Sequence, residues 1–272
     1  MPSLLQDLIQ TASDLTYDAA PHLLGDFSSP GPLLVEDYEF NGGSLPLSPQ
    51  DASAFPVSDP RTITSSINVI TDVNVWFRLE NELPGGAFNG DYYMRLEHDS
   101  GYAILLNRVG RRTGADFDST FGYADNGFNV TLDDQASAGD IHVYRLQLPL
   151  ISGGPPAQSH STAVDSTYQA ALTGTWAPDG RDASPTSVTA DLSRTKLLSQ
   201  FNGMSASGTW TLYVADLNSG GTANLVRWGM QISGLTMVPE PANLALGVTA
   251  LLAFVSAARS SRLLCLFCGR SP

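Results

Sequence analysis

One stretch, INVITDVNVWFRLE, constrains the fold more than any other part of the sequence, because its side chains alternate with a period of two. Between Ile67 and Leu79 every odd position except Thr71 is apolar, and most even positions are polar. Successive side chains of a strand point to opposite faces of a sheet. The stretch therefore predicts a β-strand with one buried face.

Other stretches predict further short strands: DYYMRLEH (91–98), GYAILL (101–106), FNVTLDD (128–134), IHVYRLQL (141–148), WTLYVAD (210–216) and LVRWGMQI (225–232). Between them lie PGG, NGD, DSG, DNG and NSGG, which are typical turn sequences. Many short strands without an amphipathic helix between them indicate an all-β domain. We expect an antiparallel β-sandwich or barrel over residues 61–235.

Charge is spread unevenly along the 272 residues, which carry a net charge of −13 and one lysine, Lys196. A surface with this much negative charge repels phosphate backbones. We therefore expect no nucleic-acid partner. Residues 1–60 hold nine acidic residues, no Lys or Arg, and many Pro, Ser and Gly. This composition predicts an acidic N-terminal segment that is loop, with at most an odd strand.

A set of motifs in the region of the strands resembles the P domain (P/Homo B domain) of subtilisin-like proprotein convertases. A Gly-Asp pair opens a strand, and Gly-x-Trp-x-Leu-x-Val-x-Asp closes the domain before a hairpin and a strand with a large apolar residue. The matching positions are Gly90, Asp91, Gly208, Trp210, Leu212, Val214, Asp216 and Trp228. The resemblance covers roughly residues 60–235 and implies a jelly-roll-like β-sandwich.

The same positions have a simpler interpretation. Trp210 and Trp228, with apolar residues two positions away, fit core indoles packed across a hairpin on neighbouring strands. The alternative is an exposed aromatic platform for carbohydrate. Asp216 precedes Leu-Asn-Ser-Gly-Gly and Asp91 follows Asn-Gly, so both carboxylates are expected to cap turn amides. A metal role for either remains an alternative.

Calcium is the one cofactor that the sequence raises. Several acidic residues cluster in one stretch: Asp116, Asp118, Asp125, Asp133, Asp134 and Asp140. Hard cations need several oxygen ligands at once, but this spacing fits no EF-hand loop. We expect solvated acidic loops and predict no cofactor and no metal ligand, with calcium as the alternative.

No residues with a catalytic pattern stand out. A subtilisin-type Asp, His and Ser triad needs a large α/β scaffold for which this chain has no room. The four histidines, His22, His98, His142 and His160, lack a glycine-flanked nucleophilic serine nearby, and His98 and His142 lie in strand-like stretches. Cys265 and Cys268 form a lone CxxC pair. We therefore predict a non-catalytic protein, although the resemblance associates it with serine endopeptidases.

The C-terminal segment 238–262 has three parts: the motif Val238, Pro239, Glu240 and Pro241, an uncharged apolar stretch at 242–258, and Arg259 with Arg262. As a single helix, the apolar stretch would span roughly 25 Å, slightly less than a ~30 Å hydrocarbon core. This order resembles the PEP-CTERM protein-sorting signal of bacteria. The resemblance implies export, insertion in the inner membrane and processing by an exosortase, a membrane cysteine protease. A terminal core helix and a permanent anchor are the alternatives.

Two departures accompany that resemblance. No N-terminal signal peptide is seen, so we expect a start codon assigned too far downstream or a truncated gene. The tail at 263–272, LLCLFCGRSP, continues past the arginines, whereas such signals end soon after them.

Three functions follow as hypotheses. The favoured one is an exported, non-catalytic module of the cell envelope or exterior that binds a partner, matrix or polysaccharide. The second is a P domain that supports a subtilisin-like endopeptidase in trans. The third is a carbohydrate-binding jelly roll, for which burial of Trp76, Trp176, Trp210 and Trp228 would be contrary evidence.

Overall fold

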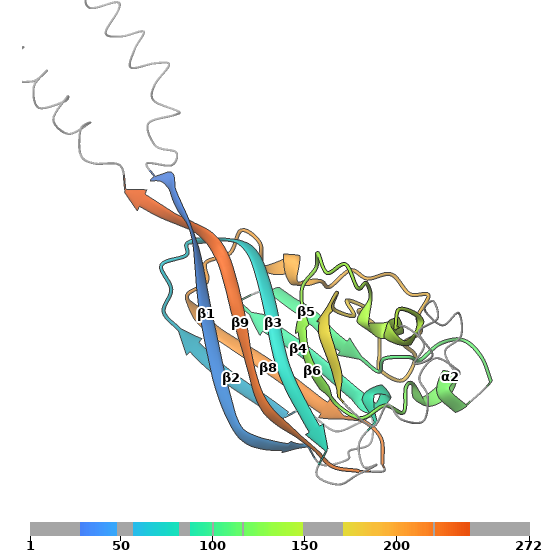
Figure 1. Cartoon of the computed structure of the whole chain (residues 1–272). Helices are drawn as coiled ribbons and strands as arrows, with labels where there is room; N and C mark the ends of the chain where they lie inside the picture. The colour runs from blue at the N-terminus through green and yellow to red at the C-terminus, as the bar shows by residue number, and fades with distance from the viewer. Residues whose placement is uncertain are drawn as a thin grey trace, which may run out of the picture. The chain divides into compact units, whose positions relative to one another are not determined.

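The computed structural model describes residues 28–47, 57–81, 88–99, 101–115, 117–148, 171–219 and 221–239. The chain divides into two units, and the larger one, Pro32–Thr236, holds most of both sheets (Figure 1). Of the other unit, only residues 28–31 and 237–239 are described. The all-β prediction is confirmed for the larger unit.

The first sheet has five strands in the order β1 (Ser28–Leu47), β9 (Ala223–Pro239), β3 (Val69–Asn81), β6 (Phe128–Leu132) and β7 (Leu172–Trp176). The predicted strand at 67–79 is its centre, β3, which pairs antiparallel with both β9 and β6. Apolar residues on one face of β3, such as Val75 and Phe77, are fully buried, as the alternation predicted.

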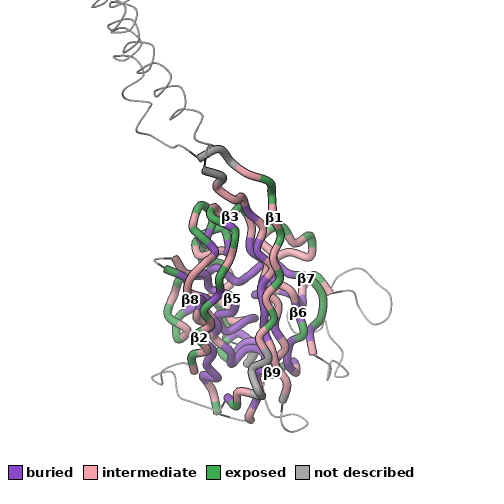
Figure 2. Tube along the Cα trace, turned by 90° about the vertical axis from the view of Figure 1, so that its left-hand side faces the viewer, coloured by how far each residue is buried: buried purple, intermediate pink, exposed green. Residues whose placement is uncertain are grey.

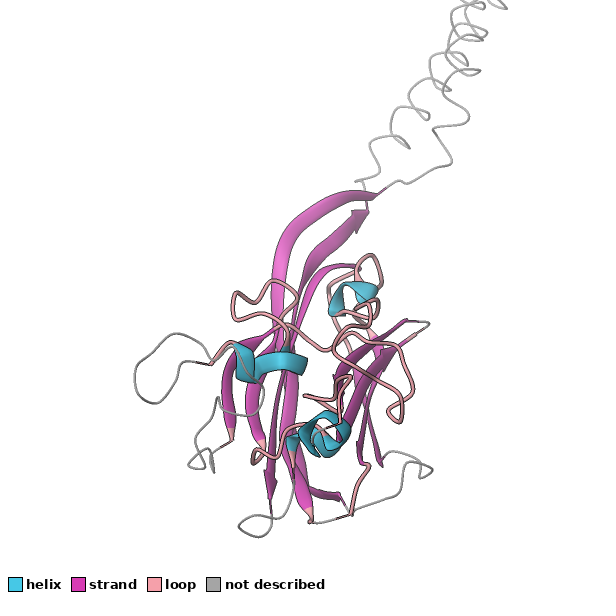
Figure 3. Cartoon of the chain, turned by 90° about the vertical axis from the view of Figure 1, so that its right-hand side faces the viewer, coloured by secondary structure: helices cyan, strands magenta, loops and turns pink. Residues whose placement is uncertain are grey.

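The second sheet has four strands in the order β2 (Val57–Ile63), β8 (Gly208–Asp216), β4 (Tyr92–His98) and β5 (Gly101–Asn107). All of its pairings are antiparallel. In the described connections, short helical turns occur at η1 (Asn89–Asp91), α2 (Phe117–Phe121), η2 (Ile141–Leu146) and η3 (Leu198–Phe201), drawn in cyan in Figure 3.

The core lies between the two sheets, where the buried residues gather in Figure 2. Trp228, Met230 and Phe77 of the first sheet belong to one apolar cluster with Met94 and Leu212 of the second. Burial of each such side chain contributes roughly 1.5–3 kcal/mol to folding. The larger unit is therefore a two-sheet β-sandwich with a single core.

Trp210 and Trp228 are core residues, but the prediction that they lie on neighbouring strands is wrong. Trp210 is on β8 of the four-stranded sheet, and Trp228 is on β9 of the five-stranded sheet. The chain crosses from one sheet to the other between β8 and β9, so no hairpin joins them. Each indole N–H has a partner: Trp210 Nε1 donates to the Ala206 carbonyl at 3.0 Å, and Trp228 Nε1 donates to Asp59 Oδ2 at 2.7 Å.

Two further corrections concern the region between β6 and β7. These strands pair in parallel, from Phe128 opposite Leu172 to Leu132 opposite Trp176, so the sheet is mixed and not purely antiparallel. A parallel pair needs a long crossover, which the chain between the two strands supplies. Residues 141–148, predicted as a strand, contain η2 instead, because the Asp140 carboxylate caps it by accepting the His142 N–H at 2.9 Å.

Residues before 61 also contribute strands to the sheets. β1 forms an edge of the five-stranded sheet, and β2 begins at Val57. The segment escapes recognition because a charged residue occupies an inner position of β1: the Glu36 carboxylate accepts the Ser65 hydroxyl at 2.6 Å and the Ser66 N–H at 3.1 Å. The predicted C-terminal helix lies outside the described residues. None of the described helices has the length and apolar content needed to cross a membrane.

Candidate functional site at the Asp91 pocket

A pocket of about 210 Å³ opens where three connections meet: η1 before β4, the end of α2, and the loop after β8. Its lining residues are Phe88, Asp91, Phe121, Gly122, Ala124, Asn218 and Ser219. The first and the last of these residues are more than 120 positions apart in the sequence. The pocket combines aromatic and small apolar walls with one buried carboxylate.

Close contact between two glycines builds one side of the pocket. A Cβ on Gly90 would lie 2.5 Å from the Phe121 carbonyl oxygen and 2.7 Å from the Gly122 Cα. Gly122 has a φ of +86°, which favours glycine as well. The Gly-Asp motif thus has a physical reason: only glycine at 90 lets η1 touch the end of α2.

The carboxylates of Asp91 and Asp216 lie together beside this contact. They are 4% and 3% exposed, and the pKa of each is raised, chiefly by burial, to about 6 for Asp91 and about 7 for Asp216. The two negative charges repel each other, which adds to the rise for Asp216. Asn218 opposes these shifts by hydrogen bonding, through its side chain to Asp91 and through its backbone N–H to Asp216 Oδ1 at 3.4 Å.

Arg108 supplies the positive charge of the site. Its Nη2 lies 3.6 Å from Asp91 Oδ1, and its Nε donates to the Gly90 carbonyl at 3.0 Å. Its φ of +51° is unusual for a residue other than glycine and places it just after β5 in the left-handed region. Burial, followed by repulsion from Arg111, lowers the pKa of Arg108.

The expected turn cap is present at Asp216. Asp91 makes a different contact with the turn, through its backbone carbonyl. Asp216 Oδ1 accepts the N–H two residues later, at Asn218. The Asp91 backbone carbonyl accepts the Leu217 N–H at 2.9 Å, and this bond ties η1 to the end of β8. Sequence reasoning named both aspartates but not their convergence, and it missed Arg108 and Asn218. A left-handed arginine leaves no signal in the sequence.

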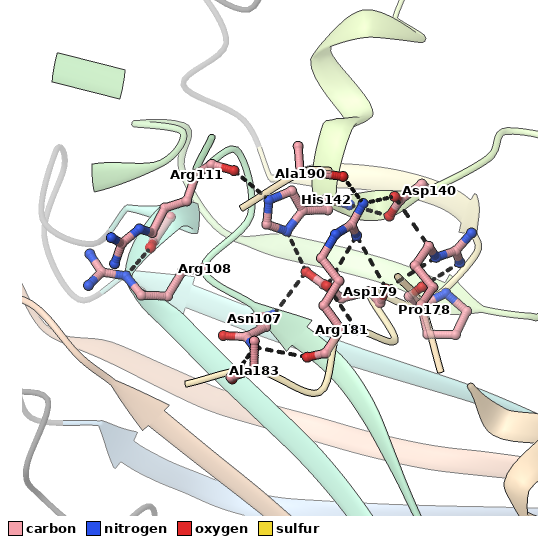
Figure 4. Close-up of polar contacts among 12 residues, drawn as sticks. Asn107, Arg108, Arg111, Asp140, His142, Pro178, Asp179, Arg181, Ala183 and Ala190 are labelled. Carbon is pink, nitrogen blue, oxygen red and sulfur yellow. Dashed lines mark hydrogen bonds and ion pairs between the residues drawn. The ribbon is translucent and has the colours of Figure 1, made fainter. Parts of the chain in front are cut away.

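Figure 4 shows the contacts of a second polar cluster, around the buried His142. His142 Nδ1 lies 2.6 Å from Asp179 Oδ2, and its Nε2 lies 2.8 Å from the Arg111 carbonyl oxygen. Both partners are acceptors, so both bonds form only when both ring nitrogens carry hydrogen. Burial raises the pKa of Asp179, but His142 and then Arg181 lower it by more, so the net shift is downward.

This His–Asp pair has the spacing of a catalytic dyad but not the access. His142 and Asp179 side chains are fully buried, and the Arg111 carbonyl occupies the ring nitrogen that would take a proton from a nucleophile. The cluster instead fastens η2 to the segment after β7. Arg181 extends it, with Nη1 at 3.2 Å from Asp179 Oδ1 and Nη2 at 2.7 Å from Asp140 Oδ2.

The aspartates considered for calcium serve separate structural roles where the structure describes their side chains. Asp125 pairs with Arg145 at 2.7 Å, and Asp140 caps η2. Asp134 accepts the N–H groups of Leu198 and Ser199 at the start of η3, and Asp133 accepts the Gln135 N–H. Asp116 and the Asp118 side chain are not described. Among the described residues, no group of three or more His, Cys, Asp or Glu is placed to hold a metal ion.

The remaining motif positions pack the core near His98. The ring of His98 stacks on Trp210 with centroids 4.1 Å apart and planes 1° from parallel. Gly208 has a φ of +135°, and a Cβ there would lie 3.0 Å from the His98 ring. Leu212 and Val214 are fully buried on the same face of β8 as Trp210.

Three of the four tryptophans are too buried for a sugar to stack on the indole ring. Trp210 and Trp228 are fully buried, and Trp176 is 3% exposed. Trp76 is half-buried on β3, where its ring packs against Gly229 and under the Arg227 guanidinium, 5.4 Å from the ring centroid. The burial of these three indoles is evidence against a tryptophan platform for carbohydrate.

The predicted sorting residues fall at the limit of the described chain. Val238 and Pro239 are the last residues of β9. Glu240, Pro241, Arg259 and Arg262, together with His22, His160, Cys265 and Cys268, lie outside the described residues.

Comparisons with known proteins give a structural likeness alone. No family model matches the chain, and no curated protein matches it. The fold is similar to the serine protease of Aeromonas sobria, with a TM-score of 0.36 and 16% identity over 80% of this chain and 30% of that one. It is also similar to a chain in the complex of that protease with its chaperone, with a TM-score of 0.37 and 16% identity over 79% of this chain and 29% of that one. The chain thus spans less than a third of the length of these structures.

Proposed function

We propose that this protein is a non-catalytic binding module with a jelly-roll-like, P-domain-type sandwich, exported and delivered to the cell envelope by its C-terminal segment. The observation that carries the proposal is that the Gly-Asp pair and the last Asp of the Gly-x-Trp-x-Leu-x-Val-x-Asp series come together beside one pocket, which Asp91 lines. Gly90 and Asp91 open β4, Asp216 closes β8, and the Asp91 carbonyl joins them through Leu217. The motif thereby organises a recessed site.

The polar groups of the sandwich support binding over catalysis. The imidazole of His142 has acceptors on both ring nitrogens, and so does that of His98, whose nitrogens lie 3.2 Å from the Thr209 carbonyl and 2.7 Å from the Ser205 carbonyl. A general base needs a free nitrogen within reach of the proton that it removes. In the described part of the chain, both histidines serve packing instead.

Delivery to the envelope rests on the order of the segment at 238–262. The motif Pro239-Glu240-Pro241 follows the sandwich, an uncharged stretch of membrane-spanning character comes next, and Arg259 and Arg262 follow it. We propose that the segment holds the precursor in the inner membrane until an exosortase-type protease removes it.

The test is expression of the natural gene in bacteria with and without an exosortase. Mass spectrometry of membrane and released fractions should show loss of the segment after the Pro239-Glu240-Pro241 motif only in the exosortase strain. Glu240→Ala should retain the segment, whereas Glu39→Ala, on β1, should be processed like the wild type. An intact tail in both strains would refute sorting.

Catalysis is tested on the processed protein with a diverse peptide library. We expect no cleavage above the background of a mock preparation. Cleavage above that background by the folded wild-type protein would overturn the non-catalytic assignment.

A further inference from the structure

We propose that the Asp91 pocket binds the side chain of a lysine from a protein or peptide partner. This inference rests on the proposed function as a binding module and names the ligand class of its pocket. It is carried by the size of the pocket, the nature of its walls and the charge balance at its base.

The pocket is the size of one side chain. Its volume of about 210 Å³ is below the roughly 300–1,000 Å³ of pockets that hold drug-sized ligands. An oligosaccharide or a nucleotide is too large, whereas a single extended side chain fits. The walls suit the methylene groups of such a chain, because Phe88, Phe121 and Ala124 line the cavity.

The base of the pocket suits an ammonium group. Asp91 lines the cavity while being 4% exposed, and Asn218 and Ser219 supply neutral polar groups beside it. A lysine offers an apolar stem and a compact charged head, which matches apolar walls above a carboxylate.

The charges around the base leave one carboxylate without a matching cation. The charge of Asp91 acts on Asp216, and Arg108 is the arginine that acts electrostatically on both. Arg111 lies near Arg108 but is committed elsewhere, since its guanidinium donates to the carbonyls of Pro185 and Thr186 at 2.7 and 2.9 Å. With both aspartates ionised, the group carries one net negative charge. An entering ammonium neutralises it.

A divalent cation fits this site less well. Calcium takes six to eight oxygen ligands, and the pocket-lining side chains that carry oxygen, Asp91, Asn218 and Ser219, do not approach that number. Arg108, with its Nη2 3.6 Å from Asp91, would also repel a doubly charged ion. The strongly acidic chain, at −13, attracts basic partners over longer distances.

Lysine binding through this site must depend on pH. Burial raises the pKa of Asp91 to about 6 and that of Asp216 to about 7, with Arg108 and Asn218 opposing the rise and the other carboxylate adding to it for Asp216. Tyr92, which lies near both aspartates, stays neutral because burial raises its own pKa far above the range tested. The ammonium favours the ionised carboxylates, so binding releases protons and tightens between pH 5.5 and pH 8.

The experiment titrates the full-length protein, in a non-ionic detergent, with Nα-acetyl-lysine-N-methylamide by calorimetry and NMR. The norleucine analogue, with the same stem and no charge, and calcium chloride are the comparison probes. We expect the lysine probe to bind at least about tenfold more tightly than norleucine and about fourfold more tightly at pH 8 than at pH 5.5, as proton linkage of Asp91 with a pKa of about 6 gives. Heats measured in buffers of different ionisation enthalpy should show proton release.

Asp91→Asn should weaken lysine binding at least about tenfold, and Phe121→Ala should weaken it several-fold by removing a wall that lies at the surface. Asp37→Asn, an exposed carboxylate on β1, should bind like the wild type. Equal binding of norleucine, a response to calcium alone, or unchanged binding in both Asp91→Asn and Phe121→Ala overturns the proposal. None of these results touches the sorting test, because Asp91 has no part in it. Normal processing without lysine binding would refute this inference alone.

Discussion

Ionisation of the buried Asp216 carboxylate lowers the stability of the folded state. Its native pKa of about 7 lies above the ordinary value of 3.8, so the folded state binds a proton that the unfolded state has released between those pH values. The contribution of Asp216 to the free energy of unfolding is therefore fully present below about pH 4 and is lost as the pH rises towards 7. Asp216→Asn removes the titration and keeps an acceptor for the Asn218 N–H.

We therefore predict that Asp216→Asn is more stable than the wild type at pH 8, and that the difference grows from about pH 4 to about pH 7. The slope should be at most about 1.4 kcal/mol per pH unit. Urea unfolding across this pH range measures it, with Asp37→Asn as the control. A difference that does not change with pH would show that Asp216 is not protonated in the folded state.

Gly90 tests the contact that shapes the pocket. In Gly90→Ala the new Cβ meets the Phe121 carbonyl and the Gly122 backbone, neither of which can rotate away. We predict a loss of about 1–3 kcal/mol in the free energy of unfolding, as for other overpacked sites. Gly203→Ala is the matched control, because its Cβ meets nothing within 4 Å and only its φ of +86° is unfavourable, at about 1–2 kcal/mol.

The stability comparison of Gly90→Ala with Gly203→Ala bears on the pocket only if Gly90→Ala also changes the structure of the pocket. Chemical shifts of Asp91 and Asn218 should move in Gly90→Ala and stay in place in Gly203→Ala. A Gly90→Ala protein that is as stable as the wild type would mean that η1 and the end of α2 are not in close contact.

Among the elements, η2 and the segment after β7 depend on the cluster around His142. We predict that His142→Gln lowers the free energy of unfolding by about 1–3 kcal/mol, because the buried Asp179 carboxylate loses one hydrogen-bond partner and keeps Arg181. Arg78→Gln, which breaks a half-exposed pair with Glu80 on β3, should cost less than about 1 kcal/mol. Denaturant unfolding measures both.

A double-mutant cycle separates the pair from its surroundings. His142→Gln with Asp179→Asn should lose less than the sum of the two single losses, because either single change already disrupts the contact between the two side chains. Strict additivity would show that His142 and Asp179 do not interact in the native state.

The sequence predicted those elements whose signal is local. The alternation of β3 and the Trp-x-Leu-x-Val series of β8 identify strands because one face of each is buried against a common core. It failed for η2, where a cap at Asp140 and buried polar partners override an apolar pattern that suits a strand. It also failed for β1, whose inner position at Glu36 is satisfied by Ser65 and Ser66, residues that no local pattern connects to it.

The pocket could be predicted only in part for the same reason. The aspartates stand next to turn sequences, so each suggests a cap by itself. Their meeting depends on β4 and β8 pairing with Tyr92 opposite Asp216, which is a long-range register. Arg108 and Phe121 come from segments whose positions depend on the fold as a whole.

At the scale of the whole molecule, the sandwich needs the N-terminal strands to close its core. Phe40 of β1 packs on Trp228 with ring centroids 4.6 Å apart, and Asp59 of β2 accepts the Trp228 N–H. Both contacts come from residues before 61. Their loss would leave β9 as a sheet edge with its largest side chain uncovered and its indole N–H unpaired.

We therefore predict that a fragment of residues 28–239 unfolds in one cooperative transition, whereas a fragment of residues 61–239 aggregates or melts without one. Circular dichroism and tryptophan fluorescence should give coincident melting curves for the longer fragment, as a single core requires. Leu33→Ser, at an exposed position of β1, should leave the longer fragment nearly unchanged and so separates loss of the strand from loss of apolar surface. If the shorter fragment melted cooperatively at the same temperature, β1 and the start of β2 would be appendages to a core that is complete from residue 61, and Trp228 would need neither Phe40 nor Asp59.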